Sequence, residues 1–293
     1  MKDRTTYAIA LIALAASVFL LGAVPSPAAD GLPAGASQAL ERSALSAPDR
    51  SLIADRAREA VRAGLPAEDV EIIISRALDR GADAAALERF LDTPLRTQQQ
   101  GLPVRPVLDR IEQGLSKGVP PARIDAAARR LADGLAKARP VVDGLLQAGL
   151  EPGPREARDA AIESIARAGE QSVPDSLVHS TGETARQQGQ SLAQFDRAVR
   201  TLTFLAGAGV PPDAAARLVR SGMERGWSDR DFGRLERRVS DMVREGRGPD
   251  EIVRSAEREI REDRGPGDGR SGGAQDRGFG GGRDAGGRGG RGR

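Results

Sequence analysis

The sequence contains no cysteine and only one histidine, His179. Without cysteine the chain has no disulfide bonds, no thiolate nucleophile and no cysteine-linked lipid anchor. The commoner zinc sites need several cysteine or histidine ligands, which one histidine does not supply. Glu183 follows His179 by four residues, but Gly182 stands between them and no third ligand is evident. We therefore predict no metal site and no cofactor, and we interpret His179 as a surface residue.

Aromatic residues are also scarce, at 3 % of the chain, whereas the hydrophobic share is 39 % and much of it is alanine. Small side chains let helices pack closely but bury little area per residue. Such a composition favours a thin stack of helices over a globule with one large core. No strand is indicated, because apolar residues do not alternate and β-branched residues are few. The predicted fold class is all-α.

Motifs of enzyme chemistry are missing as well. The chain has no phosphate-binding loop, no dinucleotide-binding fingerprint and no nucleophile elbow. Ser180 stands beside the single histidine, but nothing supplies the further partner that an activated serine requires. Carboxylates are plentiful, but arginines lie near them in sequence, as Arg234 and Arg237 do near Glu236, and this is typical of a solvated helix face. We predict that the protein is not an enzyme and has no catalytic residues.

The N-terminus has the pattern of a secretory signal peptide. Two basic residues precede an apolar run over residues 7–24, and small residues follow at Ser26, Ala28 and Ala29. The run spans 18 residues, the lower limit for a spanning helix, so an uncleaved membrane anchor is the alternative. We predict that residues 1–29 are a signal peptide, that the protein is exported to the periplasm or secreted, and that it contacts a membrane only if this segment stays uncleaved.

A junction of glycine, an apolar residue and proline recurs along the chain, beginning at Gly64, Gly101, Gly118 and Gly209. Glycine adopts the left-handed conformation after a helix, and the apolar residue folds back on the last turn. Proline then opens the next helix, where its missing N–H costs nothing. Trp227 occupies the apolar position after Gly226. We interpret it as core or cap packing, with a binding surface as the alternative.

The spacing of the glycines alternates between two values. It is 17, 20 and 17 residues from Gly64 to Gly118, and 17 and 20 residues from Gly209 to Gly246. A shorter and a longer helix therefore make a unit of 37 residues, and such a period is typical of stacked helical hairpins. We predict an α-solenoid-like stack over residues 46–262.

Three segments depart from this pattern. Residues 30–45, rich in glycine, alanine and serine, are predicted to be a flexible lead-in. Periodicity is weakest over 170–190, so the body is either one stack or two stacks separated there. The segment Arg-Pro-Val-Leu-Asp from Arg105 recurs as Arg-Pro-Val-Val-Asp from Arg139, after 34 rather than 37 residues. One copy has therefore lost nearly a helical turn.

The C-terminal segment has a different composition. Of the 33 residues from 261 to 293, 14 are glycine and few are apolar. We predict that residues 263–293 are a disordered, Gly/Arg-rich tail. The tail is similar to Arg-Gly-Gly segments of nucleic-acid-binding proteins. It has one aromatic residue, Phe279, however, and acidic residues interrupt its arginines.

These observations predict an exported, non-enzymatic repeat protein that binds another macromolecule or serves as a scaffold of the cell envelope. Its partner is then an unknown protein or envelope component. The alternative is a polyanion-binding protein whose tail contacts lipopolysaccharide, anionic lipid or extracellular nucleic acid. We do not expect nucleic acid as a partner, because an exported protein meets little of it.

Overall fold

The computed structural model describes residues 31–262, and every regular element in that range is a helix. The helices are α1 (Ala34–Arg42), α2 (Ala47–Arg62), α3 (Ala67–Asp79), α4 (Ala84–Gln99), α5 (Arg105–Ser116), α6 (Pro121–Gln147), α7 (Arg155–Glu170), α8 (Asp175–Gln187), α9 (Leu192–Gly207), α10 (Pro212–Glu224), α11 (Asp229–Arg244) and α12 (Pro249–Glu262). The all-α prediction is confirmed for this part of the chain. The predicted signal peptide, residues 1–29, and the predicted tail, residues 263–293, lie outside the described residues.

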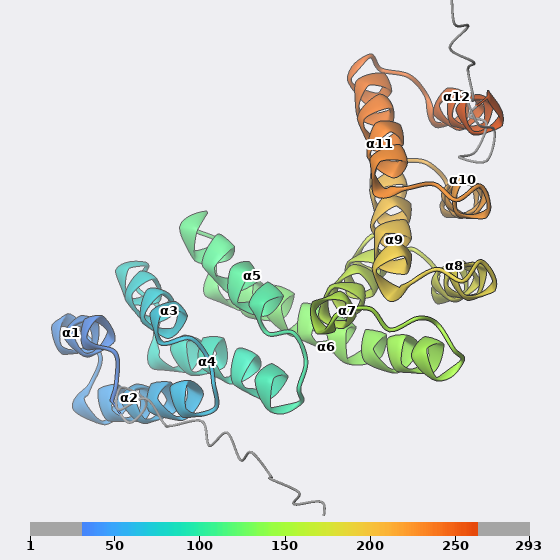
Figure 1. Cartoon of the computed structure of the whole chain (residues 1–293). Coiled ribbons are helices and arrows are strands. Elements are labelled where there is room, and N and C mark those ends of the chain that lie inside the picture. Colours follow the sequence, from blue (N-terminus) through green and yellow to red (C-terminus); the bar gives the residue numbers. More distant parts are fainter. Residues whose placement is uncertain (1–30, 263–293) are drawn as a thin grey trace, which may run out of the picture. The chain divides into compact units, whose positions relative to one another are not determined.

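The described residues form two units. Unit 1 comprises residues 31–100 and 107–128, and unit 2 comprises residues 101–106 and 129–262. In unit 1, α1 packs beside α3 and α2 packs beside α4. In unit 2, the longer helices α7, α9 and α11 pack in one row, and the shorter helices α8, α10 and α12 pack in another (Figure 1). Longer and shorter helices thus stack in separate layers, as expected of helical hairpins.

Successive helices begin 37 residues apart in both layers of unit 2 and along α2, α4 and α6, whereas α1, α3 and α5 begin at residues 34, 67 and 105. In unit 2 the longer helices begin at residues 155, 192 and 229, and the shorter ones at residues 175, 212 and 249. Helices α2, α4 and α6 follow the same rule, with starts at residues 47, 84 and 121. The predicted period is therefore confirmed. Adding 37 to a residue number gives the equivalent position in the next helix of these layers.

The glycine junctions have the predicted geometry. The backbone φ is 98° at Gly64, 67° at Gly118 and 86° at Gly209. The N–H of the residue after each glycine donates to the carbonyl oxygen five residues earlier, as from Leu65 to Ala60 at 3.0 Å. These bonds satisfy carbonyls that the end of a helix leaves without a partner. The left-handed caps are confirmed.

The period also runs through residues 170–190, where the sequence pattern is weakest. Ser172, with φ of 58°, takes the place of the junction glycine before Val173 and Pro174, and it is the one described non-glycine residue with positive φ. The N–H of Val173 donates to the carbonyl oxygen of Ala168 at 3.0 Å, as in the other junctions. A serine in the glycine position conceals this junction from a pattern based on glycine.

Helix α6 is where the stack is interrupted. It is 27 residues long, and its first part keeps the register of the longer helices. Arg139 and Pro140 lie inside it, although the matching residues Arg105 and Pro106 begin α5. The connection is 37 − 34 = 3 residues shorter than in other repeats, and residues 136–138 contain no glycine. The helix therefore continues instead of turning back, and the two units divide within it after residue 128, not near 170–190.

Helix α1 forms where a flexible lead-in over 30–45 was expected. Ala36 and Leu40 are buried, and α1 packs on α3. The carboxylate of Glu71 on α3 accepts a hydrogen bond from the N–H of Gly35 at 3.2 Å. A helix of nine residues is marginal in isolation, so packing on α3 is what stabilises it.

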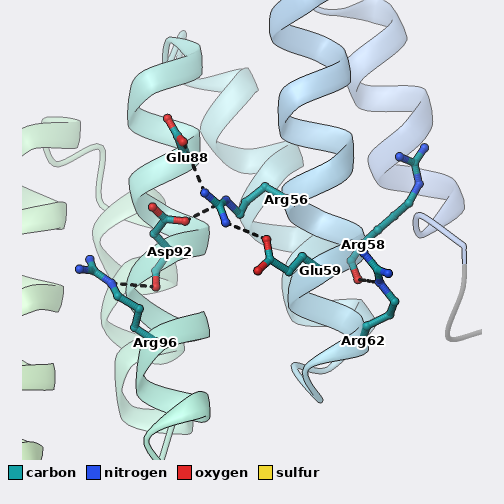
Figure 2. A network of polar contacts seen from close by, with 7 residues as sticks. All are labelled: Arg56, Arg58, Glu59, Arg62, Glu88, Asp92 and Arg96. Carbon is teal, nitrogen blue, oxygen red and sulfur yellow. Dashed lines mark hydrogen bonds and ion pairs between the residues drawn. The ribbon is translucent and has the colours of Figure 1, made fainter.

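An arginine-centred network joins α2 to α4 in unit 1 (Figure 2). The guanidinium of Arg56 lies 2.7 Å from Glu59, 3.7 Å from Glu88 and 3.0 Å from Asp92. Burial lowers the pKa of Arg56, but the hydrogen bond to Glu59 and the charges of the three carboxylates outweigh burial, so the pKa is raised. Because the three carboxylates already engage this guanidinium, we assign the network to helix stacking.

Candidate binding groove

A groove of about 940 Å³ lies over the three longer helices of unit 2. Its lining residues come from α7, α9 and α11 and from the residues just after α7 and α9. Because these helices begin 37 residues apart, equivalent turns stand side by side and present side chains to the same space. The volume is within the range of pockets that hold small ligands or parts of larger ones.

Buried and partly buried hydrogen bonds between helices fix the helices beneath the groove. The hydroxyl of Ser164 donates to Asp196 Oδ1 at 2.5 Å, joining α7 to α9. The hydroxyl of Thr201, the equivalent position in α9, donates to Glu236 at 2.7 Å, and Arg197 donates to the same carboxylate at 2.9 Å. Buried polar groups that are paired in this way specify one packing arrangement. The groove is therefore preformed.

Apolar side chains are exposed in the groove. Val243 of α11 is 44 % exposed, and Leu52 in unit 1 is the other large apolar residue that the described chain exposes to this degree. Phe204 of α9 is half-buried, and Ala160 and Ala208 also line the groove. Isolated exposed apolar residues are normal, but exposed apolar side chains gathered in a concave surface indicate a contact site.

Each of the three longer helices contributes one arginine to the lining: Arg167, Arg200 and Arg244. Each arginine pairs with a carboxylate about one turn away on its own helix, and these acids are Glu163, Asp196 and Asp241. The arginine side chains nevertheless remain 60 %, 52 % and 77 % exposed. A guanidinium has five N–H donors, so one carboxylate leaves donors for a ligand. The groove can therefore bind carboxylates beside apolar side chains.

Helix α11, which carries Val243 and Arg244, is held at its start by Asp231. The carboxylate of Asp231 accepts hydrogen bonds from the N–H of Ser228 at 2.8 Å and from its hydroxyl at 2.7 Å. Burial raises the pKa of Asp231, but the hydrogen bonds from Ser228 and the charge of Arg234 outweigh burial, so the pKa is lowered. The ionised form of this carboxylate therefore stabilises the helix terminus.

The residues that the sequence made candidates for chemistry lie elsewhere. His179 and Glu183 are exposed on α8, and Glu183 pairs with Arg186 at 2.9 Å. Between residues 31 and 262 no cluster of three or more potential metal ligands occurs. The hydroxyl of Ser180 accepts a hydrogen bond from Arg220 at 2.6 Å, which joins α8 to α10. None of these residues lines the groove.

Trp227 is a core residue, as favoured from the sequence. It is 5 % exposed, and its ring meets Phe232 edge-on, with centroids 5.5 Å apart and planes at 74°. The backbone N–H of Trp227 donates to the carbonyl oxygen of Gly222 at 3.0 Å. A Cβ on Gly222 would lie 2.7 Å from the indole. Glycine at this position therefore makes room for the largest side chain found in any junction.

The groove residues are not apparent from the sequence pattern. Phe204 falls outside the apolar stripe of its helix, which runs through Leu192, Val199 and Leu202. Val243 continues the stripe of α11, four residues after Val239, but its side chain is 44 % exposed. Phe204, an apolar residue off the stripe of α9, is the signal that could have pointed to the groove.

Comparison with known proteins adds no relative: no protein-family model matches the chain, and no curated protein matches its sequence. Within residues 31–262, none of the helices is both long enough and apolar enough to cross a membrane.

Proposed function

We propose that the protein is an exported, non-enzymatic helical-repeat protein that binds a segment of another protein in the groove over α7, α9 and α11. The observation that carries this proposal is the exposure of Val243 beside half-buried Phe204, in a concave surface to which three successive helices each contribute an arginine. The pattern of residues 1–29 supports export.

The chemistry of the lining suggests what such a segment contains. An apolar side chain would cover Val243 and Phe204, while carboxylates on either side of it would use the remaining donors of the groove arginines. The hydrogen bonds from Ser164 and Thr201 hold the floor before binding. A preformed surface loses little conformational freedom when it binds, so most of the ordering cost falls on the partner.

The experiment uses a matched pair of variants, Val243→Asn and Leu52→Asn, because the two wild-type residues are 44 % and 45 % exposed. A photo-crosslinking residue is placed at Thr203, which lines the groove, in cells that produce the protein natively. We expect crosslinking to a defined partner, whose affinity falls about tenfold or more with Val243→Asn because an unpaired amide replaces the apolar contact. Leu52→Asn should leave the affinity unchanged. Equal loss in both variants, or no partner at residue 203, would contradict the proposal.

A further inference from the structure

A second groove, of about 840 Å³, lies between α11 and α12. It shares no lining residue with the groove over α7, α9 and α11. Its lining is almost wholly charged, with six arginines and four carboxylates, and none of its lining residues is aromatic. Met242 is the single large apolar residue there.

The carboxylates of this groove are already engaged. Arg247 lies 3.3 Å from Glu245 and 2.5 Å from Glu251. Glu259 lies 3.6 Å from Arg238. The fourth carboxylate, that of Asp241, pairs with an arginine outside this groove, at 2.5 Å. All four lining carboxylates are therefore held by guanidinium groups.

Three arginines remain without a counter-charge. Arg237 of α11 and Arg254 and Arg258 of α12 line the groove and are exposed, and their side chains make no hydrogen bond or ion pair within residues 31–262. Arg254 and Arg258 are four residues apart, so they lie on one face of α12. Glu262, which lines the adjoining edge, is a carboxylate near them without an ion pair of its own. The side chains without an ion pair in and beside the groove are thus three arginines and one carboxylate.

The position of the groove at the last hairpin offers a simpler explanation, which is a polar cap for the stack. Terminal repeats need a polar outer face to keep the protein soluble. That requirement is met by paired or mixed charges. It does not account for gathering three unpaired guanidinium groups in one groove, because like charges close together repel each other.

We propose that Arg237, Arg254 and Arg258 form a binding site for the phosphate groups of anionic phospholipids, so that the C-terminal hairpin docks on a membrane surface. Guanidinium groups pair with phosphate through two parallel hydrogen bonds. Single-stranded nucleic acid also carries phosphates, but its binding sites stack bases on aromatic side chains, which this lining lacks. Residues 263–293 follow α12 in the sequence, and they contain seven arginines and four acidic residues.

The test measures binding of residues 30–293 to vesicles of phosphatidylglycerol mixed with phosphatidylcholine, at about 0.15 M salt. The groove variant is Arg237→Gln/Arg254→Gln/Arg258→Gln. The control, Arg217→Gln/Arg225→Gln/Arg230→Gln, removes the same charge from exposed arginines outside the groove. Both variants keep residues 263–293, so a difference between them reports the groove. Circular dichroism checks folding, and Arg254→Gln alone serves if the triple variant unfolds.

We expect the affinity for these vesicles to fall about fivefold per arginine removed, and on the order of 100-fold for the groove variant. The control variant should lose much less, and Glu262→Gln should bind more tightly than the wild type. Vesicles of phosphatidylcholine alone should bind none of the proteins. Equal losses in the groove and control variants would overturn the proposal, because binding would then follow net charge alone. Tighter binding of single-stranded DNA than of the anionic vesicles, at the same salt, would overturn the choice of lipid.

Discussion

Gly222 lies near the end of α10, beneath the indole of Trp227, and its replacement by alanine tests how the junctions are packed. The added Cβ would lie 2.7 Å from Cε3 of Trp227 and 3.2 Å from Cε1 of Phe232. Non-bonded carbon atoms are most stable at about 3.5 to 4.0 Å. The indole is 5 % exposed and packs edge-on against Phe232, so it cannot move away without disturbing the core.

The expected change in stability has two terms of opposite sign. Overpacking a close-packed site costs about 1 to 3 kcal/mol. Alanine in place of a helical glycine returns about 0.5 to 1 kcal/mol. We expect Gly222→Ala to lower the free energy of unfolding by about 1 to 2 kcal/mol. Gly169 of α7 is the control, because a Cβ there would meet no atom within 4 Å. Gly169→Ala should raise the free energy of unfolding by about 0.5 to 1 kcal/mol.

Urea denaturation followed by fluorescence is the assay, because Trp227 is the only tryptophan and reports on this repeat directly. The penalty of Gly222→Ala should disappear when Trp227→Leu is present, and circular dichroism follows unfolding in that double variant. The reasoning is refuted if Gly222→Ala stabilises the protein as Gly169→Ala does. It is also refuted if the penalty persists without the indole, since the clash would then lie elsewhere.

Three further predictions concern the left-handed junctions, the start of α11 and the cleavage of the N-terminal segment. Gly118→Val should lower the free energy of unfolding by about 1 to 3 kcal/mol, and Ser172→Gly should raise it by about 0.5 to 1 kcal/mol, because positive φ strains any residue with a Cβ. Urea denaturation measures both changes. Unchanged stability of either variant would contradict a left-handed junction at that position. Asp231→Asn should cost about 0.5 to 1 kcal/mol at neutral pH. The folded pKa of Asp231 lies below the unfolded value of about 3.9, so this contribution is complete above that value and is lost as pH falls through the folded pKa. Denaturation in acid should show the variant and wild type converging, and a constant difference would count against this role of the carboxylate. Mass spectrometry of the mature protein should find its N-terminus at Ala29 or Asp30, and an intact first residue on a membrane-bound protein would favour the anchor.

The hairpin architecture is predictable because its determinants are local. Gly64, Gly118 and Gly209 each end a helix in the left-handed conformation. Glycine favours this conformation through its own backbone alone, without contacts from the rest of the chain. The 37-residue period then follows from the spacing of such residues. The same reasoning overlooks Ser172, because serine has no local preference for positive φ. The hydrogen bonds of the junction hold it in that conformation.

The candidate site, by contrast, is decided by contacts between helices. Nothing in the sequence around Phe204 or Val243 states that the two side chains share a groove, because they come from different helices and meet only through the register of α9 and α11. The same holds for the indole of Trp227 above Gly222, and for the three arginines left unpaired between α11 and α12. The sequence by itself determined where the helices that stop at a glycine end, and that hairpins repeat. Only the tertiary structure decided that the stack divides within α6 and which side chains remain exposed or unpaired, because these depend on packing between residues far apart in the chain.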